Sequence, residues 1–367
     1  MKTKRARILA FYLPQFHPIK ENNIWWGKGF TEWTNVGKAK KYFRNHYQPR
    51  VPADLGYYDL RVPEVRWEQA KLAKKYGIDG FLYWHYWFGN KRKLLERPFN
   101  EALQDRSFDI DFALAWANES WQGYSHGVDK RTTLITQSYF SDKDHIEHFN
   151  SLLPAFKDKR YIKINGKPLF LIYRPTSFPN VDTFIKLWNS LAIENGFSGI
   201  YFIAHHITKK DFNEESYGQT IIRMRKYGFD AINFMRLKGF IENRNKIVKM
   251  YFNLVRIFHR GRLIYSYSKA SPFFSDIVDS YPDVIPTIIS GWDNTPRHPN
   301  GIVLKGYTPK AFNKHVKKVF ALIENKPFKE RIIFLKSWNE WAEGNYIEPD
   351  LKWGHSFLKV IRDNVFQ

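Results

Sequence analysis

The sequence contains no cysteine, which excludes disulfide bonds, a thiolate nucleophile and zinc sites built from thiolates. It also lacks any run of the roughly 18 to 20 uncharged apolar residues that a membrane-spanning helix needs. The basic residues 1–7 precede a short apolar run at 8–13, but Pro14 ends this run and no small-residue cleavage site follows. We therefore expect a buried first strand here rather than a signal peptide.

Acidic residues are few compared with basic ones. The 367 residues include 36 Asp and Glu against 58 Lys and Arg, which gives a formal net charge of +22. Such a charge indicates an anionic partner, which could be nucleic acid, an anionic membrane or an acidic substrate. Aromatic residues make up 18% of the chain and offer flat faces to bases or to sugar rings. No helix-turn-helix, RNP or zinc pattern is present, so we expect no nucleic-acid partner.

Short apolar runs of strand type alternate with longer segments of helical pattern. Eight such runs occur, at 8–13, 78–84, 112–116, 169–173, 200–204, 231–234, 284–289 and 332–336. Most are continuous rather than alternating, which is typical of parallel strands buried on both faces. Between them, the segments 63–77 and 181–196 both end in Gly, and the first begins with Pro, as helices prefer.

Eight βα units predict an α/β fold, a (β/α)8 TIM barrel with long βα loops. The alternative is an open doubly wound sheet, but no GxGxxG loop follows the first strand. No low-complexity linker divides the chain, so residues 1–367 are predicted to form a single domain.

The C-terminal ends of barrel strands meet at one site. Nearly every predicted strand end carries aromatic, amide, imidazole or carboxylate side chains, a surface that suits the apolar faces and hydroxyls of sugars. Strand four, for example, is expected to end at Tyr173 and Arg174. Any one such residue is readily explained by loop packing, but their recurrence predicts a glycan site. The candidate substrate-binding residues at these ends are Tyr12, Gln15, His17, His85, Tyr86, Trp87, Trp116, Asn118, Glu119, Trp121, His205, Trp292, Asp293, Asn294, Trp338, Asn339 and Trp341.

Glu340 and Glu343 follow the eighth predicted strand. A spacing of three on a helical turn places both carboxylates on one side. Glycosidic chemistry needs such a pair, one to protonate the leaving oxygen and one to act as base or nucleophile. Nearby rings at Trp338 and Trp341 and a second charge would raise the pKa of one carboxyl. The alternative is a solvated acidic pair, which the strand-end position and the flanking tryptophans disfavour.

Several motifs resemble the WbsX-type proteins, which have glycoside hydrolase family 99-like domains and are commonly encoded among lipopolysaccharide and capsule biosynthesis functions. They extend over nearly the whole chain, and one of them adds Trp33 as a candidate substrate-binding residue. The motifs are Leu13-Pro14-Gln15-Phe16-His17-Pro18, Trp25-Trp26-Gly27-Lys28-Gly29-Phe30-Thr31-Glu32-Trp33-Thr34-Asn35-Val36, His46-Tyr47-Gln48-Pro49, Gly166-Lys167-Pro168-Leu169-Phe170, Trp292-Asp293-Asn294-Thr295-Pro296-Arg297 and Trp338-Asn339-Glu340-Trp341-Ala342-Glu343-Gly344.

This resemblance implies a (β/α)8 barrel with retaining chemistry on an α-linked, mannose-like glycan. The sugar's own 2-hydroxyl would attack the anomeric carbon, with Glu340 as base and Glu343 as the acid for the leaving oxygen. No phosphate-binding loop or dinucleotide fingerprint is present, so we expect no cofactor and assign no metal-binding residue. Two alternatives stay open: a glycosyltransferase of lipopolysaccharide, O-antigen or capsule biosynthesis, and a non-catalytic glycan-binding barrel.

Two other patterns have weaker implications. Asp109-Ile110-Asp111 matches the Asp-x-Asp pattern of metal-dependent glycosyltransferases, but it is expected to enter strand three at the end opposite the site. Residues 142–148 contain His145 and His148, which could pair on a metal but more readily form an exposed polar helix face.

Residues 244–262 combine basic side chains with an apolar stripe at helical spacing. This pattern is consistent with a helix on an anionic membrane surface, and the alternative is a barrel helix that packs its stripe on the sheet. We expect a cytoplasmic protein that associates peripherally with the inner face of the cell membrane.

Overall fold

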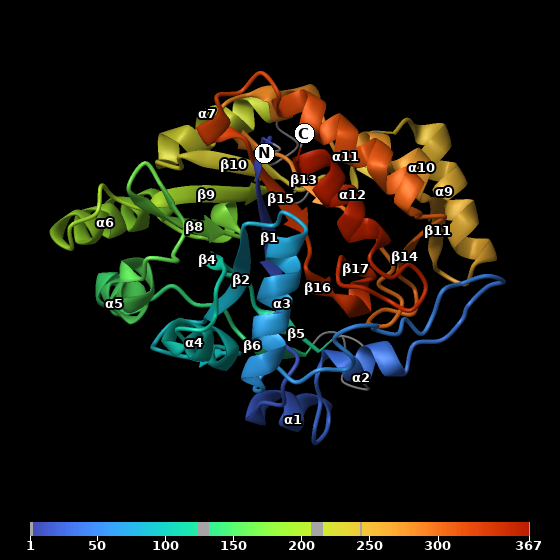
Figure 1. The fold of residues 1–367 in the computed structure, drawn as a ribbon, viewed down its shortest axis with the longest axis horizontal. Helices are drawn as coiled ribbons and strands as arrows, with labels where there is room; N and C mark the ends of the chain where they lie inside the picture. The colour runs from blue at the N-terminus through green and yellow to red at the C-terminus, as the bar shows by residue number, and fades with distance from the viewer. Residues whose placement is uncertain (1–2, 124–131, 207–215, 243, 367) are drawn as a thin grey trace.

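The computed structural model describes residues 3–123, 132–206, 216–242 and 244–366. The core of this part of the chain is a barrel of parallel strands (Figure 1). The barrel strands are β1 Arg7–Tyr12, β2 Gly80–Trp87, β4 Asp111–Trp116, β8 Lys167–Ile172, β9 Tyr201–His206, β10 Ala231–Phe234, β12 Val284–Ile285, β13 Thr287–Ile289 and β15 Ile332–Lys336. Each of the eight predicted runs coincides with a strand, and the run at 284–289 forms two.

Strand seven closes the barrel in two pieces. Pro286 separates β12 from β13 because proline has no N–H to give to a ladder. β12 pairs with β10 and β13 pairs with β15, so the same run of chain joins both sides of the sheet. The carbonyl of Pro286 accepts a hydrogen bond from the amide of Phe334 at 3.0 Å. The predicted TIM barrel is thus confirmed and the open sheet is excluded.

Helices surround the barrel and connect successive strands (Figure 1). Those that follow the barrel strands are α3 Pro63–Lys75, α4 Arg97–Gln104, α5 Asp142–Lys157, α6 Val181–Glu194, α7 Tyr217–Tyr227, α11 Pro309–Ile323 and α12 Ser356–Val365. Helix α3 begins at Pro63 as predicted and buries Ala70 and Ala73, whose small side chains allow close packing. Gly77 has a φ of +84°, a backbone conformation that favours glycine, and this residue redirects the chain toward β2.

Short elements build the loops. At the carboxyl ends of the strands lie α1 Lys20–Trp26, α2 Glu32–Gly37, β5 Trp121–Gln122, β6 Thr133–Ile135, β16 Asn339–Glu340, η6 Trp341–Glu343 and β17 Asn345–Tyr346. β3 Lys93–Leu94, which pairs with the end of β2, and η1 Pro175–Ser177, which follows β8, also lie there. β7 Lys163–Ile164 pairs with the start of β8, and η5 Phe328–Glu330 precedes β15.

A second hydrophobic cluster lies beside the barrel, between strands six and eight. It includes Phe240, Phe252, Tyr267 and Phe274. The elements that form it are α8 Gly239–Glu242, α9 Lys246–Phe258, β11 Leu263–Ser266, α10 Tyr267–Ala270, η3 Ser271–Phe273 and β14 Ile302–Lys305. β11 and β14 form a separate two-stranded parallel sheet.

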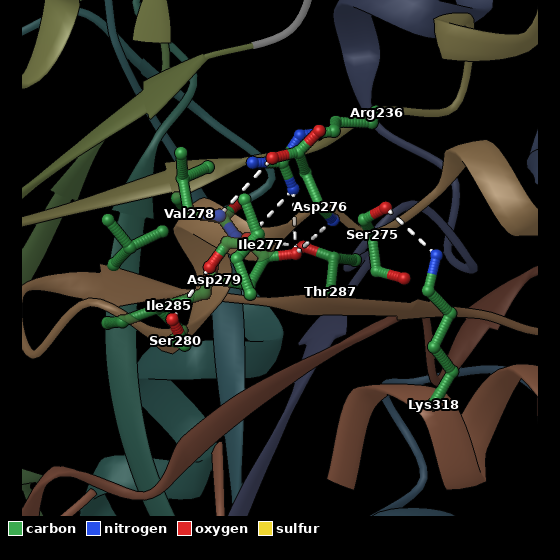
Figure 2. Close-up of polar contacts among 12 residues, drawn as sticks. Arg236, Ser275, Asp276, Ile277, Val278, Asp279, Ser280, Ile285, Thr287 and Lys318 are labelled. Carbon is green, nitrogen blue, oxygen red and sulfur yellow. Dashed lines mark hydrogen bonds and ion pairs between the residues drawn. The ribbon is translucent and has the colours of Figure 1, made fainter. Parts of the chain in front are cut away.

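A buried ion pair connects the end of β10 to the short helix η4 Ile277–Ser280 (Figure 2). Arg236 donates from Nη1 to both carboxylate oxygens of Asp279 at 2.8 Å, and both side chains are almost fully buried. Asp279 also accepts a hydrogen bond from the amide of Asp276. This pair holds the chain where it leaves strand six.

None of the helices in the described ranges is long and apolar enough to cross a bilayer.

Candidate active site

A cavity of about 460 Å³ lies at the carboxyl ends of the barrel strands, where the fold predicts a site. Its lining comes from loops that follow most of the strands. The residues are Leu13, Gln15, Trp26, Phe30, Glu32, Asn35, Trp84, Tyr86, Ala117, Glu119, Ser120, Trp121, Gln122, Tyr173, Arg174, Met235, Leu237, Lys238, Trp292, Asn294, Arg297, His298, Ile302, Lys336, Glu340 and Glu343.

Glu340 and Glu343 both line this cavity and both bind one arginine. Arg297 donates from Nη2 to Glu340 at 3.2 Å and from Nη1 to Glu343 at 2.8 Å. Its Nε donates to the buried Glu32 at 2.7 Å. The predicted helical turn is instead a short strand, β16, followed by the 3-10 turn η6. The two carboxylates still face the same cation.

The surroundings of Glu340 raise its pKa. Burial raises the pKa of Glu340, and the neighbouring charge of Glu343 raises it further. The charges of Arg297 and Lys336 lower this pKa, but they do not cancel the rise. Glu340 is therefore a stronger base, when ionised, than an exposed carboxylate would be.

The loop that carries the pair is anchored by its own motif residues. Asn339 accepts a hydrogen bond from the amide of Leu13 at 2.7 Å and donates to its carbonyl at 3.1 Å, which ties strand eight to strand one. Trp341 stacks on Tyr346 with ring centroids 3.8 Å apart and donates from Nε1 to Glu348 at 2.6 Å. These contacts fix the backbone on which the two carboxylates stand.

Aromatic rings form one wall of the cavity. Trp26 and Trp121 stack with centroids 6.2 Å apart, and Tyr86 meets the edge of Trp121 at 5.1 Å. Trp84 and Tyr173 contact each other edge to face at 5.3 Å. The cavity thus combines flat apolar faces with the carboxylate pair.

Comparison with known proteins identifies the family and the type of barrel. The sequence model of the family described as "Glycosyltransferase WbsX" matches residues 8–361. The chain belongs to the WbsX glycosyltransferase family. Family membership supports a carbohydrate-active enzyme.

The curated relatives of this WbsX-family chain include the uncharacterized protein WxcX from two strains of Xanthomonas campestris pv. campestris. Each is 35% identical over 98% of this chain and 50% of its own length. The chain therefore spans about half the length of the curated relatives it matches.

Solved structures share the barrel at low sequence identity. A glycoside hydrolase-like protein superposes with a TM-score of 0.59 at 15% identity, covering 100% of this chain and 95% of its own. The GH99 endo-alpha-mannosidase from Bacteroides thetaiotaomicron has a TM-score of 0.55 at 13% identity, covering 99% and 97%. These likenesses show that the WbsX-family chain has the GH99 type of fold.

The cavity of this WbsX-family barrel contains part of the predicted set. Besides the two glutamates, the predicted residues that line it are Gln15, Tyr86, Glu119, Trp121, Trp292 and Asn294. The other predicted residues are not among its lining. These are Tyr12, His17, Trp33, His85, Trp87, Trp116, Asn118, His205, Asp293, Trp338, Asn339 and Trp341.

The alternation of side chains along a strand explains why some predicted residues do not line the cavity. Side chains alternate between the two faces, so Trp84 and Tyr86 reach the cavity while His85 and Trp87 point away from it. His85 instead shares a 2.8 Å hydrogen bond with His148 on α5, and Trp87 stacks on the same imidazole.

Other predicted substrate-binding residues make hydrogen bonds within the protein instead of lining the cavity. Tyr12 donates its hydroxyl to Gln69, and Trp33 donates from Nε1 to the carbonyl of Tyr58. Asp293 turns away from the cavity and accepts hydrogen bonds from Gln48 and Thr295. Trp116 donates a hydrogen bond to the carbonyl of Trp87, and Asn118 donates one to the hydroxyl of Tyr139. His205 stacks on the ring of Tyr173. His17 and Trp338 are buried.

The expected exposed helix face at 142–148 is wrong. His148 and Asp144 are buried, because α5 packs this face against β2 and α6. Asp144 accepts a hydrogen bond from the amide of Asn90. Within the described residues, no group of three or more metal-ligating side chains is found.

The Asp-x-Asp pattern lies where it was predicted. Asp111 begins β4 and pairs with Arg7 at the start of β1, at the end of the barrel opposite the cavity.

The sequence analysis did not include Arg297, which binds both glutamates, among the candidate site residues. Arg297 stands in a quoted motif, but nothing in its spacing shows that it meets Glu340 and Glu343. Lys336, the last residue of β15, was also missed. Trp84 ends the second predicted run and lies inside β2, but it was not among the candidate residues. A search of strand-end positions for inward-facing residues would have found these two.

Proposed function

We propose that the chain cleaves or transfers an α-linked, mannose-like glycan of cell-surface polysaccharide metabolism, with Glu340 and Glu343 as base and acid. One observation carries this proposal: two carboxylates converge on Arg297 in a cavity with aromatic walls, at the catalytic end of a barrel. Trp26 and Trp121 supply the stacking faces that the apolar side of a sugar ring requires.

In the first step, Glu340 takes the proton of the sugar's 2-hydroxyl while that oxygen forms a bond to the anomeric carbon. Glu343 gives its proton to the glycosidic oxygen as the bond to the anomeric carbon breaks. The raised pKa of Glu340 supports its role as base, because proton transfer works best near the operating pH. A nucleophile carried by the substrate also removes the need for a carboxylate on the opposite face of the ring.

In the second step, an incoming hydroxyl opens the three-membered ring at the anomeric carbon. Its proton passes to Glu343, and the 2-oxygen recovers the proton held by Glu340, so both groups return to their starting states. Water as the incoming group gives hydrolysis, and a sugar hydroxyl gives transfer.

Glu340→Gln and Glu343→Gln test the roles of the pair. Removing a general acid or base costs about 10²- to 10⁴-fold in rate. We therefore expect either variant to lose at least ~10²-fold in the release of reducing ends from α-mannose-containing polysaccharides. Glu324→Gln on the exposed end of α11 is the matched control and should retain activity. Equal turnover by wild type and both site variants would disprove the assignment.

A glycosyltransferase that uses a nucleotide sugar is the second candidate, and the description of the WbsX family as glycosyltransferases favours it. Consumption of nucleotide sugar without release of reducing ends would support this reading. A non-catalytic glycan-binding barrel would bind polysaccharide in wild type and in Glu340→Gln, with no turnover in either.

We also propose that the enzyme works in the cytoplasm, at the inner face of the membrane, and that residues 1–367 form one domain. The basic, apolar segment 244–262 supports the location. Fractionation of cells that express the chain would test it: recovery outside the cytoplasm and inner membrane would contradict the proposal.

A further inference from the structure

The outer surface of α9 is unusually apolar for a helix beside a barrel. Phe252 is the buried residue of this helix, and Val248 and Val255 pack against the second hydrophobic cluster. Six large apolar side chains point to solvent. Their exposures are Ile247 72%, Met250 60%, Tyr251 54%, Leu254 47%, Ile257 73% and Phe258 82%.

These six residues form one continuous surface. At 3.6 residues per turn they fall within an arc of about 120° on the helix, next to the narrower arc that packs on the cluster. The alternative predicted for this segment, a helix that packs its stripe on the sheet, therefore accounts for only its smaller apolar face. Figure 1 shows α9 at the margin of the molecule, outside the ring of helices that covers the barrel.

Basic residues flank this apolar surface. Residues 244–262 contain six Lys and Arg and no Asp or Glu. Lys246 and Lys249 lie along one border of the apolar arc, and Arg260 follows the C-terminal end of the helix. In the described part of the chain, none of these three forms an ion pair with an acidic side chain. Their charges are available to an anionic surface.

We propose that α9 binds the surface of an anionic phospholipid bilayer, with its six apolar side chains in the interface and its basic flank on the headgroups. The combination of a wide apolar arc and uncompensated basic charge is that of a helix lying in the plane of a membrane. Lipid phosphates satisfy the charge, whereas a protein partner would need a matching acidic groove. This surface would hold the enzyme at the inner face of the membrane, and its biological purpose rests on the proposed function. Binding to lipid itself does not depend on catalysis.

Flotation of the full chain with vesicles tests the proposal. Vesicles of phosphatidylcholine with phosphatidylglycerol should carry the protein at low salt, and vesicles of phosphatidylcholine alone should not. Because each basic residue near such a surface contributes about 1 kcal/mol, the double variant Lys246→Glu and Lys249→Glu should bind at least ~10-fold more weakly. The double variant Ile257→Glu and Phe258→Glu should lose binding.

The control places the same change on another exposed apolar residue. Ile193 on α6 is 62% exposed, and Ile193→Glu should float like wild type. Turnover of a soluble oligosaccharide should be unchanged in the α9 variants. A chain without glycan activity that still floats would refute the proposed function and leave the membrane surface standing.

Three results would overturn the proposal. They are no binding of wild type to anionic vesicles at low salt, equal binding to neutral vesicles, and a dimer that the change Ile257→Glu and Phe258→Glu converts to monomer in sedimentation. The last result would show that a second copy covers α9.

Discussion

Glu348 shows how burial changes the pKa of a single carboxyl group. It contacts the loop that carries Glu340 and Glu343, and it accepts hydrogen bonds from Trp341, Tyr58 and Gln69. Burial raises its pKa to about 7, and these three donors only partly offset the rise. The folded protein therefore holds a proton on Glu348 that the unfolded chain would release at lower pH.

This proton makes stability depend on pH. Because the folded pKa lies above the ordinary value of 4.5, the contribution of Glu348 is lost as pH rises through about 7. We expect a loss of about 2 to 3 kcal/mol in the free energy of unfolding between pH 5 and pH 8 from this residue. Urea denaturation of Glu348→Gln should lack this component. An identical pH dependence in variant and wild type would contradict the pKa.

Arg297 restrains the rise in the pKa of Glu340. Its charge lowers the pKa of Glu340, and its loss would leave Glu32, Glu340 and Glu343 without the cation they share. Arg297→Met should therefore raise the pKa of Glu340 further. The acidic limb of the pH profile of kcat/KM should move to higher pH, together with a loss of activity. Glu32→Gln removes a negative charge instead and should not move the limb upward.

Among the elements, the β10 end depends on a buried charge pair rather than on local propensity. Arg236 and Asp279 lie 43 residues apart in the chain and form an ion pair (Figure 2). Arg236 stands between Met235 and Leu237, which line the cavity. Burial raises the pKa of Asp279 and the charge of Arg236 lowers it, so the carboxylate relies on this partner.

Arg236→Ala should destabilise the fold strongly, because it leaves Asp279 buried without its counter-charge. Losses of about 3 to 5 kcal/mol are usual for such a change. The exposed pair of Lys71 and Glu68 is the control, and Glu68→Gln should cost less than about 1 kcal/mol. Urea denaturation compares the two variants; similar effects would show that the buried pair is not a main support of this region.

The helices and strands themselves were largely predictable. Eight continuous apolar runs identified the barrel strands, since strands buried on both faces carry an uninterrupted pattern. The proline and glycine signals located the ends of α3, and those of α6 were also close. The turn type at Glu340 and the burial of His148 were predicted wrongly. Both depend on neighbours distant in sequence: β17 pairs with β16, and His85 of β2 meets α5.

On the scale of the whole molecule, the aromatic excess and the positive charge have different roles. Many rings that seemed suited to sugars pack within the scaffold, as Trp116, Trp338 and Trp341 do. Part of the charge gathers beside the apolar face of α9.

Composition and pattern were enough to predict the barrel, the end at which its cavity lies and the position of Glu340 and Glu343 there, because these follow from local apolar runs and chain order. They could not show which strand-end residues face inward, that Arg297 joins the two carboxylates, or that the wide apolar arc of α9 stays uncovered. These features arise from strand alternation, barrel closure and packing between segments far apart in the chain, so they exist only once the chain has folded.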